Sequence, residues 1–217
     1  MAKGRNDRQR EEQRAAKAAR REASERRQQR NKWLVRAAIA LVALGAAAVG
    51  YRSYQQRDLL ASVTTASYAA GQHSAGRLSW KESPPVGGPH NVAWQNCGVY
   101  NAPVHNEHAV HSLEHGAVWI TYRPDLPADQ VQRLASLAAT DYMLVSPYPG
   151  LPAPVVATAW NHQIRLDGAG DPRLMAFIAA YRNNPRNTPE FGAACFGGIS
   201  TTAATNTLAA APGPMGR

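Results

Sequence analysis

Four of the seven histidines of the chain lie within twelve residues, from His105 to Gly116, together with two glutamates. The imidazole ring titrates near neutral pH and is the commonest side-chain ligand for metals such as zinc and copper. A short helix from His108 to His115 would place His108, His111 and His115 within about 60° of one another around its axis, since each residue advances about 100°. The spacing therefore predicts that three imidazoles can meet one metal ion, with Gly116 ending the helix.

A further imidazole could reach the same ion from outside this cluster. His90 follows a loop, residues 82–89, whose prolines and glycines exclude regular structure. Sites rich in imidazole nitrogen suit Zn²⁺ or Cu²⁺, and sulfur from Met143 or Cys97 would shift the preference toward copper. The candidate metal ligands, for copper or zinc, are therefore His111, His115, His90 and His108.

Glu114 is expected to accept a hydrogen bond from one of these imidazoles and so to orient it, as metal-bound histidine usually requires. The same residues also allow a structural network of His and Glu that holds no ion. A third alternative is a small metal-dependent hydrolase, because residues 111–115 match H-x-x-E-H, where two histidines bind zinc and the glutamate activates water. Only three of those five positions are fixed and no further context supports the match, so the sequence favours a role without catalysis.

Cys97 and Cys195 are the only cysteines of the chain. Two cysteines in an exported domain most often form a disulfide. Such a bridge would close a loop of about 100 residues and contribute roughly 4 to 5 kcal/mol of stability through the entropy of the unfolded chain. The alternatives are a thiolate metal ligand at Cys97 or a redox pair, and the lack of a C-x-x-C motif disfavours the second.

The positive charge of the chain is confined to its beginning. Residues 1–36 hold thirteen Lys or Arg and five Asp or Glu, a net charge of +8, whereas the whole chain carries +9. Residues 1–32 contain no large aliphatic side chain and are expected to be a disordered or solvated helical basic tail. Because the rest of the chain is nearly neutral, no nucleic-acid binding is expected of the exported domain.

Residues 33–51 are apolar apart from Arg36 and are long enough to cross a bilayer. Trp33 and Tyr51 bracket the segment as interfacial aromatic residues would, and the basic tail should remain in the cytoplasm. A cleaved signal peptide is the alternative, because Ala46–Ala48 could form a cleavage site, although the preceding 32 residues are long for a signal. We therefore expect a single-pass signal anchor in the cell membrane, with a cytoplasmic N-terminus and an extracytoplasmic C-terminal domain.

The predicted layout continues with a stalk or entry segment, residues 52–80, that shows only a weak amphipathic pattern. The exported domain follows at residues 81–196. From residue 197 to 217 the composition is Thr, Ala, Gly and Pro without periodicity, which predicts a disordered tail. The expected partners are the membrane itself, through residues 33–51, and a protein of the cell envelope whose identity the sequence does not give.

Short apolar runs alternate with two amphipathic segments in the exported domain. The runs predict strands at residues 117–122, 141–147, 154–160 and 162–166. The amphipathic segments, residues 127–137 and 171–181, predict helices, with Pro127 in the first turn of one and Asp171 as the N-cap of the other. This order predicts an α+β fold in which a small mixed or antiparallel sheet packs against two helices.

Several motifs occur together in the order and spacing of a known family. They are Pro84-Pro85, Gly88-Pro89-His90, Trp94, Gly98-Val99-Tyr100 and His111-Ser112-Leu113-Glu114-His115-Gly116-Ala117-Val118, followed by Ala157, Ala159-Trp160 and Pro189-Glu190. In these residues the chain, over roughly positions 55 to 192, resembles an uncharacterised bacterial family catalogued as domain of unknown function 3105. The resemblance implies an exported or membrane-anchored bacterial domain and names no reaction. It directs attention to His90, His111, Glu114 and His115.

Overall fold

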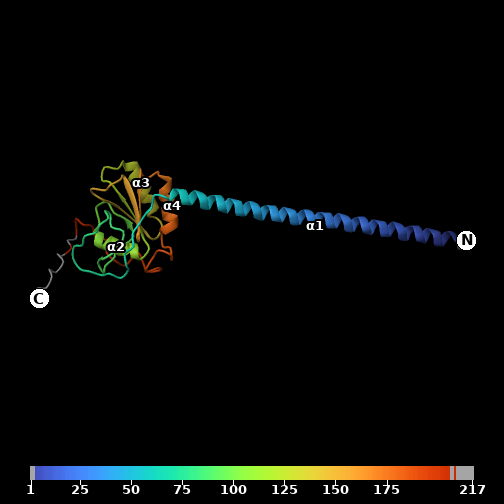
Figure 1. Cartoon of the computed structure of the whole chain (residues 1–217), viewed down its shortest axis with the longest axis horizontal. Coiled ribbons are helices and arrows are strands. Elements are labelled where there is room, and N and C mark those ends of the chain that lie inside the picture. The colour runs from blue at the N-terminus through green and yellow to red at the C-terminus, as the bar shows by residue number, and fades with distance from the viewer. Residues whose placement is uncertain (1–2, 206–207, 209–217) are drawn as a thin grey trace. The chain divides into compact units, whose positions relative to one another are not determined.

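The computed structural model describes residues 3–205 and residue 208, and the chain divides into two compact units at Gln55 and Gln56 (Figure 1). The described residues of the first unit all belong to helix α1, Lys3–Leu59, whose last residues lie in the second unit. The second unit contains a sheet and the three remaining helices. The chain is therefore a long apolar N-terminal helix followed by an α+β domain.

Helix α1 is continuous through the basic tail, where Ala, Arg, Gln and Glu are good helix formers. The predicted span, residues 33–51, lies inside it, and its side chains are exposed apart from the half-buried Ala37. Within the described residues, Arg20–Leu59 is the one helical stretch long and apolar enough to cross a membrane, a criterion that a signal sequence also meets. An apolar helix that buries nothing in its own chain fits a lipid environment.

The sheet has six strands in the order β1-β6-β5-β3-β4-β2. They are β1 (Thr64–Thr65), β2 (Gly98–Val99), β3 (Val118–Tyr122), β4 (Met143–Pro147), β5 (Val155–Ala159) and β6 (His162–Leu166). Strand β4 runs parallel to β3 and β2, whereas the pairs β3–β5, β5–β6 and β6–β1 are antiparallel. The predicted α+β fold with a mixed sheet is confirmed.

The helices cover both faces of this sheet. They are α2 (Asn106–Glu114), α3 (Ala128–Leu137) and α4 (Pro172–Tyr181). On one face Ile120 of β3 packs in a cluster with Leu134 of α3 and Phe177 of α4. On the other face its neighbour Trp119 packs with Leu113 of α2. Because both faces are covered, β3, β4 and β5 are buried along their whole length, which explains why their sequences are continuous apolar runs.

Two predicted extensions lie against the domain. After α1 ends, Leu60 and Val63 pack on the cluster under α3 and α4, so this part of the predicted stalk contributes to the core. Beyond Gly197, the amide N–H of Ile199 donates to the Trp94 carbonyl at 2.9 Å, and that of Ala203 donates to the Pro103 carbonyl at 2.7 Å. These two residues of the predicted tail therefore contact the domain, and residues 206–207 and 209–217 lie outside the described part of the chain.

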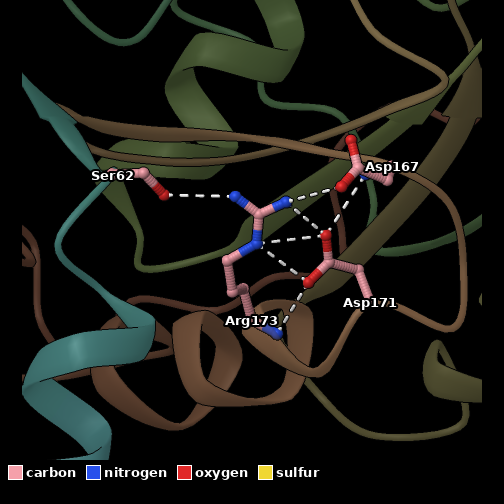
Figure 2. Close-up of polar contacts among 4 residues, drawn as sticks. All are labelled: Ser62, Asp167, Asp171 and Arg173. Atoms are coloured by element: carbon pink, nitrogen blue, oxygen red, sulfur yellow. Dashed lines mark hydrogen bonds and ion pairs between the residues drawn. The ribbon is translucent and has the colours of Figure 1, made fainter.

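An ion-pair network fixes the start of α4 (Figure 2). The Asp171 carboxylate caps the helix by accepting the Arg173 amide N–H at 2.9 Å, and it also accepts the Arg173 guanidinium N–H groups at 2.5 to 3.1 Å. The same guanidinium reaches Asp167 at 3.2 Å and Ser62 at 3.3 Å. The hydrogen bonds from Arg173 hold the pKa of Asp171 below its ordinary value. This network joins the segment after α1 to the beginning of α4.

We expect Asp171→Ala to lower the free energy of unfolding by about 1 kcal/mol, as the loss of an N-cap usually does. The effect should be present near neutral pH and disappear in acid. A carboxylate with a lowered folded-state pKa stabilises the fold above its ordinary pKa, and this contribution is lost as the pH falls through the lowered value. Urea unfolding at pH 7 and pH 3 measures both. Asp167→Ala is the control, since its 95% exposed carboxylate should contribute little, and an equal loss there would contradict the assignment.

Candidate metal centre

Four side chains from three separate stretches bring their donor atoms together beside α2. His111 and Glu114 come from α2, His90 from the loop before it, and His73 from the segment after β1. Each offers one nitrogen or oxygen, and these atoms all lie within 4.8 Å of one another. His73 is exposed, whereas the other three are buried. We call these four residues the inner group.

A backbone contact brings the segment around His73 together with the loop that contains His90. The His90 amide N–H donates to the Gln72 carbonyl at 3.0 Å, and the Ser74 amide N–H donates to the His90 carbonyl at 2.7 Å. This short parallel bridge sets the rings of His73 and His90 edge to face, with their centroids 5.0 Å apart. The two imidazoles are therefore neighbours because of chain pairing that links positions far apart in the sequence.

Two glycines determine the backbone path beside the site, one in the loop before His90 and one after α2. Gly88 has φ +90°, and a Cβ there would lie 2.8 Å from the Tyr68 ring, so the loop needs glycine to turn its carbonyl toward His90. Gly116 follows α2 with φ +101°, and a Cβ there would lie 2.9 Å from Thr188. Helix α2 therefore ends where the sequence predicts, and the chain leaves it toward β3.

Backbone carbonyls hold the imidazole rings in one orientation. In each of four rings Nδ1 lies 2.7 to 2.8 Å from a carbonyl oxygen, which can only accept a hydrogen bond. The pairs are His90 with Gly88, His108 with Ala93, His111 with Asn91, and His115 with Ala194. Nδ1 therefore carries the proton, and the neutral ring presents the lone pair of Nε2, as in most histidine metal sites.

The innermost contact joins His90 and Glu114. Nε2 of His90 lies 2.8 Å from Oε2 of Glu114, and both side chains are fully buried. Apart from this contact, neither atom has a hydrogen-bond partner among the described residues, while Oε1 of Glu114 accepts the Gly71 amide N–H at 2.6 Å. A lone pair and a carboxylate oxygen at this distance repel each other unless a cation lies between them. That cation is either a proton or a metal ion.

The electrostatics of the pair favour such a cation. Burial alone would lower the pKa of His90, but the contacts with Glu114 and the Gly88 carbonyl outweigh it and hold the pKa above its ordinary value. Burial would raise the pKa of Glu114, but the contacts with His90 and Gly71 keep it low. The Glu114 carboxylate and a cation on the His90 ring, here a proton, therefore stabilise each other.

His111 lies at the centre of the imidazoles. Its ring centroid is 4.8 Å from that of His90, 5.0 Å from that of His73 and 4.6 Å from that of His115. Burial, and then the neighbouring imidazoles, lower the pKa of His111 to about 4. The ring is therefore neutral at pH 7, as a metal ligand must be.

A second group of donor atoms shares His111. We call His111, His115 and Glu190 the outer group, because the Glu190 side chain is 42% exposed. Nε2 of His115 lies 3.1 Å from Oε2 of Glu190. The Trp94 ring flanks this group, with its centroid 4.9 Å from that of His115. The outer group is open to solvent at Glu190, and His111 links it to the buried pair.

The predicted ligands separate in the structure. His90 and His111 lie in the inner group and His115 in the outer group. His108 lies in neither of the groups found among the described residues, and its Nε2 is buried there without a hydrogen-bond partner. Glu114 was predicted to orient an imidazole ring, but its carboxylate lies among the donor atoms of the inner group. Backbone carbonyls orient the rings instead.

Two residues of the site escaped the sequence reasoning. His73 is an isolated histidine between glycines, and the backbone bridge that brings it to His90 leaves no local sequence signal. Glu190 was visible only as part of the family-like motif Pro189-Glu190. Its backbone amide donates to the Glu114 carbonyl at 3.1 Å, which places its carboxylate beside α2.

Sulfur is absent from both groups within the described part of the chain. Cys97 forms the predicted disulfide with Cys195, with their Cα atoms 5.4 Å apart. Met143 is buried in the cluster under α3 and α4, on the other face of the sheet from α2. The reason for expecting Cu(I) therefore disappears, and the nitrogen and oxygen donors suit divalent ions such as Zn²⁺ or Cu²⁺.

The arrangement defines a class of protein: an α+β domain with buried His and Glu groups that could hold a metal ion, preceded by an apolar helix. A family model described as a protein of unknown function (DUF3105) matches residues 72–197, more than half of the chain. The chain belongs to this family, as its motifs predicted. No curated protein and no solved structure was found to match it. The apolar helix, as signal or anchor, and the disulfide indicate an exported domain.

Proposed function

We propose that this protein binds one divalent transition-metal ion, Zn²⁺ or Cu²⁺, in the inner group. The observation that carries the proposal is the buried pair of His90 and Glu114, whose facing atoms lie 2.8 Å apart and make no hydrogen bond with any other described residue. Donor atoms around a tetrahedral zinc ion lie roughly 3.3 Å apart. The donor atoms of His90 and Glu114 are 2.8 Å apart, and all donor atoms of the inner group lie within 4.8 Å of one another. The expected separation falls between these two distances.

The proposed role is binding without catalysis. The inner group supplies four protein donors, which fills a tetrahedral ion, whereas catalytic zinc keeps one position open for water. The hydrolase alternative needs Glu114 as a base beside bound water, but this side chain is fully buried and faces His90. The remaining alternative is an envelope interaction module in which a proton lies between His90 and Glu114.

We also propose the cell membrane as the location, with the N-terminus in the cytoplasm and the metal site outside. Three features support this. The apolar part of α1 buries nothing in its own chain, the basic residues precede it, and the domain carries a disulfide. An unidentified envelope protein remains the proposed partner. Nucleic acid is not proposed as a partner, because the domain is nearly neutral in sequence.

The test is the thermal unfolding of the full-length protein in detergent, first with EDTA and then with Zn²⁺ or Cu²⁺. An ion that binds only the folded state should add about 2.7 kcal/mol of stability at 100 times its dissociation constant. Mg²⁺ is the matched control and should add nothing, because it prefers oxygen ligands. If neither transition metal changes the unfolding temperature, the His and Glu residues form the structural network instead.

A further inference from the structure

The outer group repeats the arrangement of the inner one at the surface. In both, a carbonyl holds the Nδ1 proton of a histidine, and Nε2 of that histidine faces a carboxylate oxygen. The side chains of His90 and Glu114 are 0% exposed, whereas those of His115 and Glu190 are 5% and 42% exposed. The second pair therefore offers the same donors where solvent can reach them.

His111 connects the two pairs but can serve only one ion at a time. Its Nδ1 is occupied by the hydrogen bond to the Asn91 carbonyl at 2.8 Å, which leaves Nε2 as its single donor. The ligand atoms of each group lie within 4.8 Å of one another, and His111 belongs to both. Two ions at full occupancy would compete for the same lone pair. The groups are therefore alternative positions for one ion.

We infer that the outer group is the entry position through which a divalent transition metal reaches the inner group. This inference rests on the proposed function. The Glu190 carboxylate and His115 capture the ion from solvent, and His111 joins as the third donor. The bonds from the ion to Glu190 and His115 then break as bonds to His90, Glu114 and His73 form, while the bond to His111 is kept. A proton held between His90 and Glu114 leaves to water. No electron is transferred, so the oxidation state of the ion does not change.

An entry position changes rates and leaves the final complex unchanged. Once the ion is in the inner group, Glu190 is no longer among its donors, so this carboxylate should contribute little to the equilibrium affinity. Its negative charge does lower the barrier for an approaching cation, and carboxylates in such positions raise association rates by about 10-fold or more. Because release follows the same route backwards, dissociation should be accelerated by the same factor.

The experiment follows Cu²⁺ binding to the full-length protein in detergent by stopped flow, with tryptophan fluorescence as the signal. The Trp94 ring beside His111 and His115 should be quenched by the ion. Glu190→Gln should slow association and dissociation together by about 10-fold, with a dissociation constant within about twofold of wild type. Glu190→Lys should slow both further. Asp129→Asn, which removes an exposed carboxylate on α3, is the matched charge control and should change neither rate.

The outcomes separate this inference from the proposed function. If the wild type binds no Cu²⁺ or Zn²⁺ at all, the proposed function fails. If the wild type binds and Glu190→Gln associates at the same rate, the ion enters elsewhere, for example past the exposed His73, and only the inference fails. If Glu190→Gln weakens the equilibrium affinity while association is unchanged, Glu190 is a ligand of the final complex, and the inference is again overturned.

Discussion

Replacing His111 with glutamine should lower the affinity of the protein for Zn²⁺ or Cu²⁺ by at least about 100-fold. His111 is the one residue that both donor groups contain, so its loss leaves neither group complete. Changes to residues that merely support a ligand already cost 10- to 100-fold in metal affinity, which makes 100-fold the lower limit for a ligand itself. Isothermal titration of the full-length protein in detergent measures the effect.

The matched control for this prediction is His108→Gln. His108 lies one turn earlier on α2, is equally buried, and makes the same kind of Nδ1 hydrogen bond, to the Ala93 carbonyl at 2.7 Å. The two variants should lose similar amounts of metal-free stability, but only His111→Gln should lose the ion. If both variants lose the ion, the original prediction from helix spacing is right to include His108. If His111→Gln retains the ion, the two donor groups are wrongly assigned.

The double substitution Cys97→Ser/Cys195→Ser should lower the free energy of unfolding by roughly 4 to 5 kcal/mol, the value expected for a loop of about 100 residues. The bridge joins positions 98 residues apart. A loss of this size is a large part of the 5 to 15 kcal/mol that stabilises most domains. Urea unfolding of the full-length protein in detergent measures it.

Reduction provides the control for the disulfide. A reductant should lower the stability of the wild type to that of the double variant and leave the variant unchanged. The double variant should also take up metal more slowly, since the segment before Cys195 supplies Glu190 and the carbonyl of Ala194 that orients His115. A stability loss below about 1 kcal/mol would show that the native contacts of this segment hold it without the bridge.

Much of the fold was visible in the sequence because local signals determine it. The strand predicted at residues 162–166 agrees with β6 to the residue, and Asp171 caps α4 as expected. The apolar runs gave the central strands because those strands are buried on both faces. Strand pairing order, in contrast, depends on contacts between distant segments and was predicted only as mixed or antiparallel.

The candidate site was only partly predictable, for a physical reason. Helix spacing alone assigns α2 one functional face, but every residue from Glu107 to Glu114 is buried. Different faces therefore contact different segments, and His108 contacts the Ala93 carbonyl and lies in neither donor group found among the described residues. His73 joins the inner group through backbone pairing with the His90 region, which no spacing rule describes.

The scattered origin of the inner donors limits where the protein could acquire the proposed ion. Only His111 and Glu114 are close in sequence, and the other donors join them through the folded loop and the bridge between His73 and His90. An extended chain in transit across a membrane therefore lacks the site. Under the proposed function, metal binding would be coupled to folding. The ion would then come from the compartment in which the domain folds, and for an exported domain the metals available outside the cytoplasm would determine its identity.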